Sequence, residues 1–267
     1  MPTWKNAPQS PFGHEVERLP LTDTLVRVVA QVRFAPVLSV HDQAFIAPFQ
    51  EATRQQYPLV RKEIQQQVAP GVGGALKLAD SVLWKFIDAE DNWQVTLSDT
   101  FVSLDCKRYT QREDFMKRLS ETLSAVGTHI RPVLMNRVGV RYTNRLSGDE
   151  TLDQLHEFIR SELLGLAGSE LDGAETLSEV TQAEFTVGNV DLRGRWGHLP
   201  AGATHDASVS AIGSESWILD LDAYRELTTP FDPTVCEQEA ERFSDIVYGF
   251  FRWAVSDEFL QAHGAEQ

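Results

Sequence analysis

Two aspartates with a spacing of two residues are the first candidates for chemistry in this chain. Asp220 and Asp222 lie in a segment with strand-like composition, so both carboxylates are expected on one face. Two carboxylates on one face can bind a divalent cation or share acid–base work. A metal would need a third ligand, for which Asp105, Glu226 and His205 are available. The alternative is a polar strand face paired to arginines, and no spacing here matches a known metal-binding loop.

A second candidate group consists of arginines in a segment whose alternation predicts a strand over residues 133–146. Arg137 and Arg141 flank Gly139 on one face, where glycine lets another group approach the backbone closely. Guanidinium groups suit bidentate recognition of carboxylate or phosphate. One interpretation is a small-anion or nucleotide site between two halves of the chain, and the other is ion pairing with the abundant acids. The candidate ligand-binding residues are Arg33, Arg137, Arg141, Asn144 and Arg145.

Other reactive residue types are present without a supporting arrangement. His198, His205 and Asp206 occur in one loop, but their spacing fits no standard zinc pattern. The chain has no Gly-x-Ser-x-Gly elbow, and neither Cys106 nor Cys236 has a neighbouring histidine. Both cysteines are expected to be small core residues. The sequence therefore predicts no catalytic residue and no cofactor.

The net charge of −15 is distributed unevenly along the chain. Residues 1–147 contain 18 Lys+Arg and 15 Asp+Glu, whereas residues 148–267 contain 6 and 24. An acidic half repels phosphate backbones, so a nucleic-acid partner is not expected. It attracts a basic protein surface, although a solvated acidic surface that keeps the protein soluble is the alternative. Trp4 and Phe12 lie in a polar N-terminal segment and are candidate partner-binding residues.

Length and composition limit the class of protein. With 267 residues, of which 42% are hydrophobic, the chain can bury one large core or two small ones. No apolar run reaches the ~18 residues of a membrane span, and no secretory signal is recognisable at the start. Two distant cysteines make no disulfide framework. We therefore expect a cytoplasmic protein that does not bind membranes.

The order of predicted elements indicates an α+β fold with two similar lobes. Each lobe reads strand, helix, several strands, helix, and each is expected to be a mostly antiparallel sheet with helices on one face. The predicted divisions are an extended arm at 1–18, a first lobe at 19–131 and an acidic second lobe at 132–267. Strands are predicted at 25–34, 62–68, 81–88, 93–97, 101–109, 133–146, 180–187, 191–196, 207–212 and 217–222. Helices are predicted near 42–52, 110–127 and 152–166, and from Asp232-Pro233 onward, with a glycine-rich loop at 70–74.

Several of these segments together resemble a sporadically distributed family of uncharacterised bacterial proteins. The most specific is 137–144, and the others are 25–34 with Pro36, Phe49, Tyr57-Pro58, 93–97, 101–109 and Phe115. The resemblance covers most of the chain from residue 19 and implies a bacterial protein of patchy occurrence, as in defence or toxin–antitoxin loci. It implies no catalytic residues. We expect a non-enzymatic protein-binding or regulatory protein that engages a basic partner through its acidic half. The alternative is a small-anion or nucleotide-binding sensor or enzyme with a pocket between the lobes.

Overall fold

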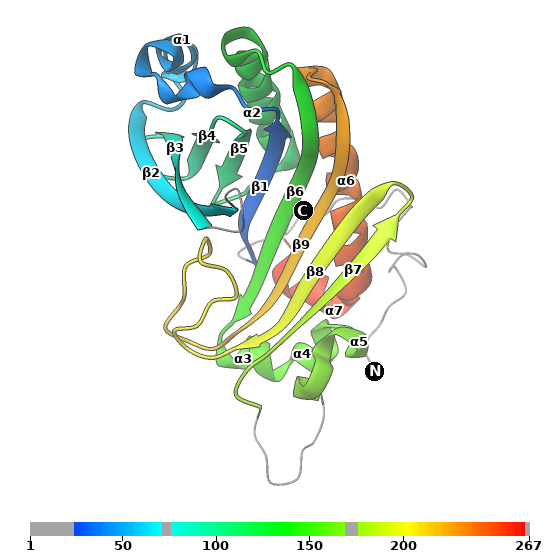
Figure 1. The fold of residues 1–267 in the computed structure, drawn as a ribbon. Coiled ribbons are helices and arrows are strands. Elements are labelled where there is room, and N and C mark those ends of the chain that lie inside the picture. Colours follow the sequence, from blue (N-terminus) through cyan, green and yellow to red (C-terminus); the bar gives the residue numbers. More distant parts are fainter. Residues whose placement is uncertain (1–23, 71–75, 169–175, 265–267) are drawn as a thin grey trace.

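All strands in the described part of the chain belong to one antiparallel sheet. The computed structural model describes residues 24–70, 76–168 and 176–264, and its sheet has nine strands in the order β2-β3-β4-β5-β1-β6-β9-β8-β7 (Figure 1). The strands are β1 (Leu25–Phe34), β2 (Leu59–Pro70), β3 (Leu76–Ile87), β4 (Trp93–Leu97), β5 (Phe101–Cys106), β6 (Leu134–Ser147), β7 (Glu179–Val187), β8 (Val190–Leu199) and β9 (Ser216–Pro230). The predicted α+β class is confirmed.

The two halves of the chain share this sheet and do not form a separate sheet each. β1 and β6 pair along their length, with Val32 opposite Val138, and this ladder joins residues 19–131 to residues 132–267. On one side β1 is followed by β5, β4, β3 and β2, and on the other β6 is followed by β9, β8 and β7. The expectation of two sheets is therefore corrected to one sheet with a central β1–β6 seam. An origin by duplication stays a prediction.

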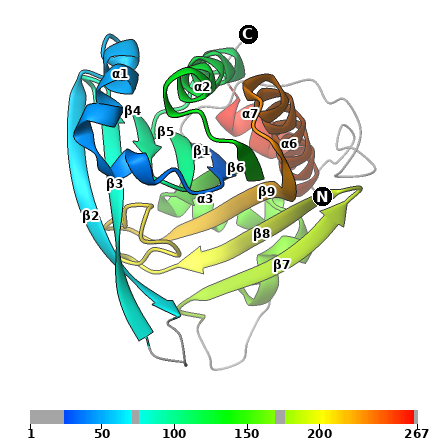
Figure 2. The same cartoon turned by 45° about the horizontal axis from the view of Figure 1, so that its top comes forward.

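The larger helices cover one face of the sheet. α2 and α6 pack against each other, and α6 also contacts β6 and β9. Figures 1 and 2 show α2, α6 and α7 together on that face, while the sheet curves around them. The helices are α1 (Gln43–Thr53), α2 (Arg112–Ala125), α3 (Asp149–Asp153), α4 (Leu155–Phe158), α5 (Ser161–Leu164), α6 (Pro233–Ala254) and α7 (Asp257–His263).

Alternation along the central strands separates a buried face from a polar face. In β1, Val28, Ala30 and Val32 are buried in one core with Phe243 and Phe250 of α6. Intervening positions of β1 face away from this core, as the two-residue period of a strand requires. The helix-covered face therefore supplies stability, and the opposite face is available for polar chemistry.

Two of the helix starts follow their predicted capping residues. The Asp42 carboxylate accepts a hydrogen bond from the Ala44 backbone N–H at 2.9 Å. The Asp232 carboxylate does the same for Thr234 at 2.8 Å, with Pro233 as the first helical residue. Each cap satisfies a backbone donor that the first turn leaves unpaired.

Two predicted elements of the second half are wrong. The helix expected at 152–166 is divided into α3, α4 and α5, because Ile159 leaves the helical path to pair with Val255 and Arg160 N–H bonds to the Ala254 carbonyl at 3.0 Å. The strand expected at 207–212 is irregular loop. Val209 in that loop is nevertheless buried, which explains why its apolar pattern imitates a strand.

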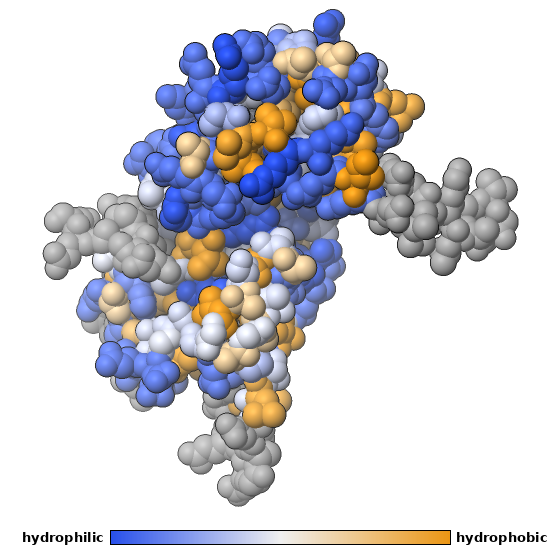
Figure 3. Space-filling model, turned by 90° about the vertical axis from the view of Figure 1, so that its left-hand side faces the viewer, coloured by the Kyte–Doolittle hydropathy of each residue, from blue (hydrophilic) through white to orange (hydrophobic). Residues whose placement is uncertain are grey.

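The edge strand β2 carries both exposed apolar and charged side chains. Leu59, Val60 and Ile64 are exposed on it, while Glu63 pairs with Lys85 at 2.7 Å. Figure 3 faces the side where β2 lies in Figure 1 and shows a mostly hydrophilic upper region with small hydrophobic patches. Charged residues on an edge strand hinder pairing with another sheet edge.

Candidate functional site

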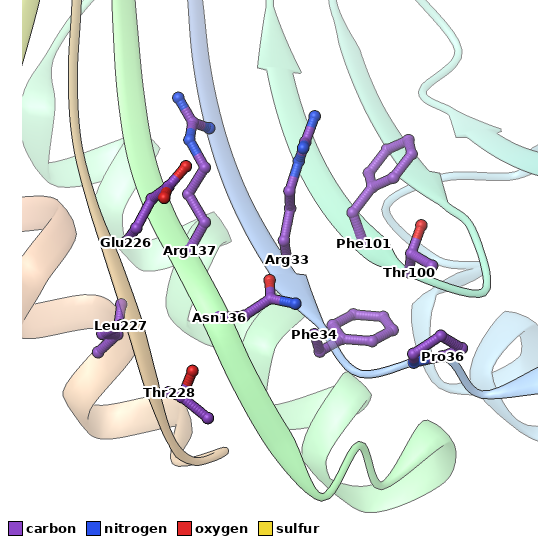
Figure 4. Close-up of a pocket in the computed structure, with 10 residues that line it drawn as sticks. All are labelled: Arg33, Phe34, Pro36, Thr100, Phe101, Asn136, Arg137, Glu226, Leu227 and Thr228. Atoms are coloured by element: carbon purple, nitrogen blue, oxygen red, sulfur yellow. The ribbon is translucent and has the colours of Figure 1, made fainter. Parts of the chain in front are cut away.

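The open face of the sheet carries a row of four side chains across the β1–β6 seam. Arg33 of β1 lies opposite Phe101 of β5 on one side and opposite Arg137 of β6 on the other. Arg137 in turn lies opposite Glu226 of β9. Figure 4 shows all four side chains leaving their neighbouring strands in the same direction. The seam between the two halves thus presents an aromatic ring, two guanidinium groups and a carboxylate side by side.

This row lines part of a pocket of about 840 Å³, a size typical of small-molecule sites. Its walls are lined by Arg33, Phe34, Pro36, Thr100, Phe101, Asn136, Arg137, Glu226, Leu227 and Thr228 (Figure 4). Apolar rings and a few charged groups converge on the same space. That combination suits an organic ligand that carries an anionic group.

Irregularities in two strands occur where the pocket lies. Between Arg137 and Met135, β6 has one residue more than β1, so Asn136 is extra in that ladder. In the β6–β9 ladder the extra residue is in β9. Leu227 and Thr228 lie between Glu226 and Thr229, whereas β6 has only Asn136 between the partners Arg137 and Met135. Bulges bend a strand and increase its twist, and they are common beside binding sites. Asn136, Leu227 and Thr228, the residues at these two irregularities, all line the pocket.

The two arginines of the row differ in how their charge is balanced. Arg137 donates from Nη2 to Asp222 Oδ2 at 3.2 Å, and its guanidinium lies 4.5 Å from the Tyr224 ring centre. Arg33 is exposed and donates from Nε to the neutral Gln31 Oε1 at 3.1 Å, and no carboxylate among the described residues forms an ion pair with it. Like charges directly opposite on neighbouring strands are destabilising. Of the two arginines at the pocket, Arg137 has an ion-pair partner and Arg33 has none among the described residues.

Gly139 leaves space that side chains next to this row occupy. A Cβ at position 139 would lie 3.1 Å from Arg137 Nη1 and 3.1 Å from Tyr224 Cβ. The space that the sequence suggested for an approaching ligand is therefore filled by the protein's own side chains. Glycine here lets the Arg137 guanidinium and the Tyr224 ring come together across the strands.

Burial and ion pairing set the protonation of Asp222. Burial raises the pKa of the Asp222 carboxyl above its ordinary value, and the nearby Arg137 and Arg141 offset this only in part. The charge on the partner of Arg137 is thus lost at a higher pH than that of an ordinary aspartate. The electrostatic potential at the pocket becomes more positive as the pH falls.

A second, more buried cluster lies further along β6 and β9. Arg141 donates from Nε and Nη2 to the two oxygens of Asp220, both at 2.7 Å. Thr143 Oγ1 donates to Asp220 Oδ1 at 3.0 Å, and His205 Nε2 lies 3.3 Å from Asp220 Oδ2. The Asp220 side chain is only 4% exposed. The ion pairing expected between the arginines of β6 and the aspartates of β9 is therefore present.

The hydrogen bonds of this cluster outweigh the effect of burial on its carboxylates. Burial alone would raise the pKa of Asp220, but the His205 and Arg141 contacts lower it. Burial likewise opposes ionisation of Asp206, whose pKa is lowered by hydrogen bonds from Ser208 and by Arg141 at 2.9 Å. Both aspartates are thus charged in the folded protein at neutral pH.

Residues 200–213 form a loop that is fastened over this cluster by side-chain contacts. Asp206 pairs with Arg141, Ser208 bonds to Arg27, and the Ser210 carbonyl accepts from Arg145 Nη1 at 2.8 Å. Arg145 is buried, and its Nε and Nη2 have no hydrogen-bond partner among the described residues. Burial lowers the pKa of Arg145. The loop thus supplies its own carboxylate and backbone oxygens to the arginines of β6.

The remaining predicted site residues are not brought together with the arginine row. Asn144 alternates with Thr143 and Arg145 and lies on the opposite face of β6, where it is buried. Trp4 and Phe12, with the arm at 1–18, fall outside the described residues. Across residues 24–70, 76–168 and 176–264, no group of three or more histidine, cysteine, aspartate or glutamate side chains is placed to hold a metal ion.

The two cysteines are buried and are not among the residues that line the pocket. Cys106 and Cys236 are free and each is fully buried. Burial raises the pKa of each thiol to about 12, so neither is a thiolate at neutral pH. Their expected role as small core residues is confirmed.

Sequence reasoning missed three contributors to the pocket. Phe101 and Asn136 were not singled out, and Glu226 was considered only as a metal ligand. The signal for Glu226 was its position an even number of residues after Asp220 and Asp222, which places it on the same strand face. Asn136 carries no such signal, because its role depends on a bulge that only the pairing of strands defines.

Comparison with known proteins gives no further guide to the site. No family model, curated protein or solved structure matches the chain. No helix among the described residues has the length and apolarity to cross a membrane. The resemblance to a bacterial family stays a prediction.

Proposed function

We propose that the protein binds a small anionic ligand in the pocket at the β1–β6 seam. The observation that carries the proposal is Arg33, which faces the pocket beside Arg137 without a carboxylate partner among the described residues. Two guanidinium groups on adjacent strands offer several N–H donors to one carboxylate or phosphate. A bound anion would relieve the repulsion between the two arginines. The role is that of a ligand sensor or an enzyme subsite.

The apolar wall limits the ligand to an organic anion. The Phe101 ring stands next to Arg33 in the row, and Pro36 and Leu227 add apolar surface. Aromatic and aliphatic surface holds the body of a ligand, while the charged groups fix its orientation. An inorganic ion would use only the arginines and leave the rest of the pocket filled with water.

Calorimetric titration with benzenesulfonate tests the proposal. This probe combines a ring with a charge that does not change between pH 4 and pH 8. We expect one molecule to bind per chain, and we expect inorganic phosphate to compete for the same site. Binding should disappear in Arg33→Glu and persist in Arg54→Glu, a matched change in an exposed arginine of α1. Equal binding by both variants would place the anion elsewhere.

The raised pKa of Asp222 gives the proposal a pH dependence. Protonation of Asp222 releases Arg137 from its ion pair, so affinity for benzenesulfonate should increase as the pH falls from 7 to 4. Asp222→Asn should show the higher affinity already at pH 7, by about tenfold, the value of one charge-assisted hydrogen bond.

Titrations of the wild type and Asp222→Asn at both pH values provide the check. A matched control is Asp191→Asn, an exposed aspartate on the neighbouring strand β8. A wild-type affinity that falls with decreasing pH, or an Asp222→Asn variant with unchanged affinity, would contradict the role given to Arg137.

A basic protein partner is a second candidate, supported by exposed acids on the helical segment that follows β6. The exposed carboxylates there are Asp149, Glu150, Asp153, Glu157 and Glu162, and no lysine or arginine among the described residues forms an ion pair with them. We expect a deca-lysine peptide to bind at 25 mM salt and to be released at 300 mM salt, within the range where screening weakens surface charges.

Amide substitution of the first four acids should abolish this binding. The control replaces Glu51, Glu63, Glu90 and Asp91 of the first half by their amides. Binding that survives the first set of substitutions would show that this segment does not hold the peptide.

A further inference from the structure

We propose that the ligand of the seam pocket is a small zwitterion the length of a dipeptide, with its carboxylate on Arg33 and Arg137 and its ammonium on Glu226. The inference rests on the proposed function and specifies its ligand class. The charges along and beside the row balance. Arg33 and Arg137 contribute two positive charges, and Asp222 and Glu226 contribute two negative ones.

The two ends of the row are left complementary to opposite charges. Asp222 is engaged by Arg137, whereas Glu226 is exposed and forms no ion pair with a lysine or arginine of the described residues. Arg33, on the far side of Arg137 from Glu226, forms no ion pair with a carboxylate of the described residues. A doubly charged phosphate would gain from the arginines but would be repelled by Glu226. A ligand with one charge of each sign satisfies both ends.

The spacing of the strands sets the length of the ligand. Neighbouring strands are about 4.8 Å apart, so a point midway between β1 and β6 lies about 7 Å from β9. An extended chain spans about 3.3–3.6 Å per residue, which gives a dipeptide about 7 Å. A single α-amino acid is too short to reach both the arginine pair and Glu226 along this direction.

Other residues that line the pocket can contact the peptide group and the side chains of such a ligand. Asn136 and the hydroxyls of Thr100 and Thr228 line the pocket and can bond to a peptide group. Phe101 and Leu227 offer apolar contact to small side chains. The volume of about 840 Å³ leaves room for side chains larger than methyl groups.

The test compares dialanine with two blocked forms by calorimetry. N-acetyl-dialanine lacks the ammonium, and dialanine amide lacks the carboxylate. In the wild type we expect dialanine to bind about fivefold more tightly than N-acetyl-dialanine, the contribution of one exposed ion pair. The amide should not bind detectably, because it carries nothing for the arginines.

Glu226→Gln should remove the preference without removing the site. In this variant dialanine and N-acetyl-dialanine should bind equally, and Glu150→Gln, an exposed glutamate of α3, should behave as the wild type. Equal affinities in the wild type, or tighter binding of inorganic phosphate than of dialanine, would overturn the zwitterion while leaving anion binding intact. Failure of every anion, benzenesulfonate included, would overturn the proposed function as well.

Discussion

Asp220→Ala is expected to lower the free energy of unfolding by about 3–5 kcal/mol, the usual cost of removing one partner of a buried ion pair. Asp220 accepts two bonds from Arg141 and one from Thr143, and it contacts His205. Alanine would leave the Arg141 guanidinium with only the part-exposed Asp206. Chemical denaturation measures the loss directly.

The same substitution should loosen the loop at 200–213. His205 loses its carboxylate partner, so protease cleavage within the loop should become faster than in the wild type. The control is Asp191→Ala, whose side chain is exposed. If Asp220→Ala does not fold, Asp220→Ala with Arg141→Met removes both charges and should recover part of the stability. A stability change below about 1 kcal/mol in the single variant would contradict the buried pair.

Stability should also depend on pH through this cluster. Because the pKa values of Asp206 and Asp220 are lowered in the folded state, their contribution is complete above the ordinary aspartate pKa and is lost as the pH falls below it. Asp222 has the opposite effect on the pH dependence of stability, because its pKa is raised in the folded state. Its favourable contribution is present at low pH and is lost as the pH rises through its folded pKa.

Arg33→Glu is expected to weaken binding of benzenesulfonate by about 100-fold or more. The change removes an attraction of about 1.5 kcal/mol and adds a repulsion of similar size. The fold should not suffer, because Arg33 is exposed and makes no ion pair within the described chain. Glutamate opposite Arg137 replaces a repulsive cross-strand pair by an attractive one. The melting temperature should therefore equal or exceed that of the wild type.

The combination of lost binding and retained stability separates a ligand-binding arginine from a structural one. Arg54→Glu, in an exposed i,i+3 pair with Glu51, controls for the change in net charge. A melting temperature that drops together with affinity in Arg33→Glu would mean that this arginine supports the fold. Unchanged affinity would remove Arg33 from the site.

The local features of the sequence predicted most strands and the faces of their side chains. Alternation in β6 correctly placed Arg137 and Arg141 on one face, because a two-residue period needs no knowledge of neighbouring strands. Ion pairing of these arginines with the abundant acids was one of the two interpretations, and the structure pairs Arg141 with Asp220. Which arginine remains unpaired was not predictable, since it depends on register, and Arg33 meets Arg137 only through the β1–β6 ladder.

The pocket itself lay beyond sequence reasoning. It forms where β6 has one residue more than β1 and β9 has one residue more than β6, and no residue type marks such a position. The single sheet was missed for a related reason, because each half has its own strands and helix and only the β1–β6 pairing joins them.

The most direct test of the anion site is the ¹H–¹⁵N NMR spectrum of the arginine Nε–Hε groups during titration with benzenesulfonate. The Arg33 and Arg137 signals should shift together and saturate with one ligand, while those of Arg54 and of the buried Arg141 stay in place. Assignment follows from the loss of one signal in Arg33→Gln and another in Arg137→Gln. Shifts that are spread over all exposed arginines, or that leave Arg33 unchanged, would contradict a binding site at the β1–β6 seam.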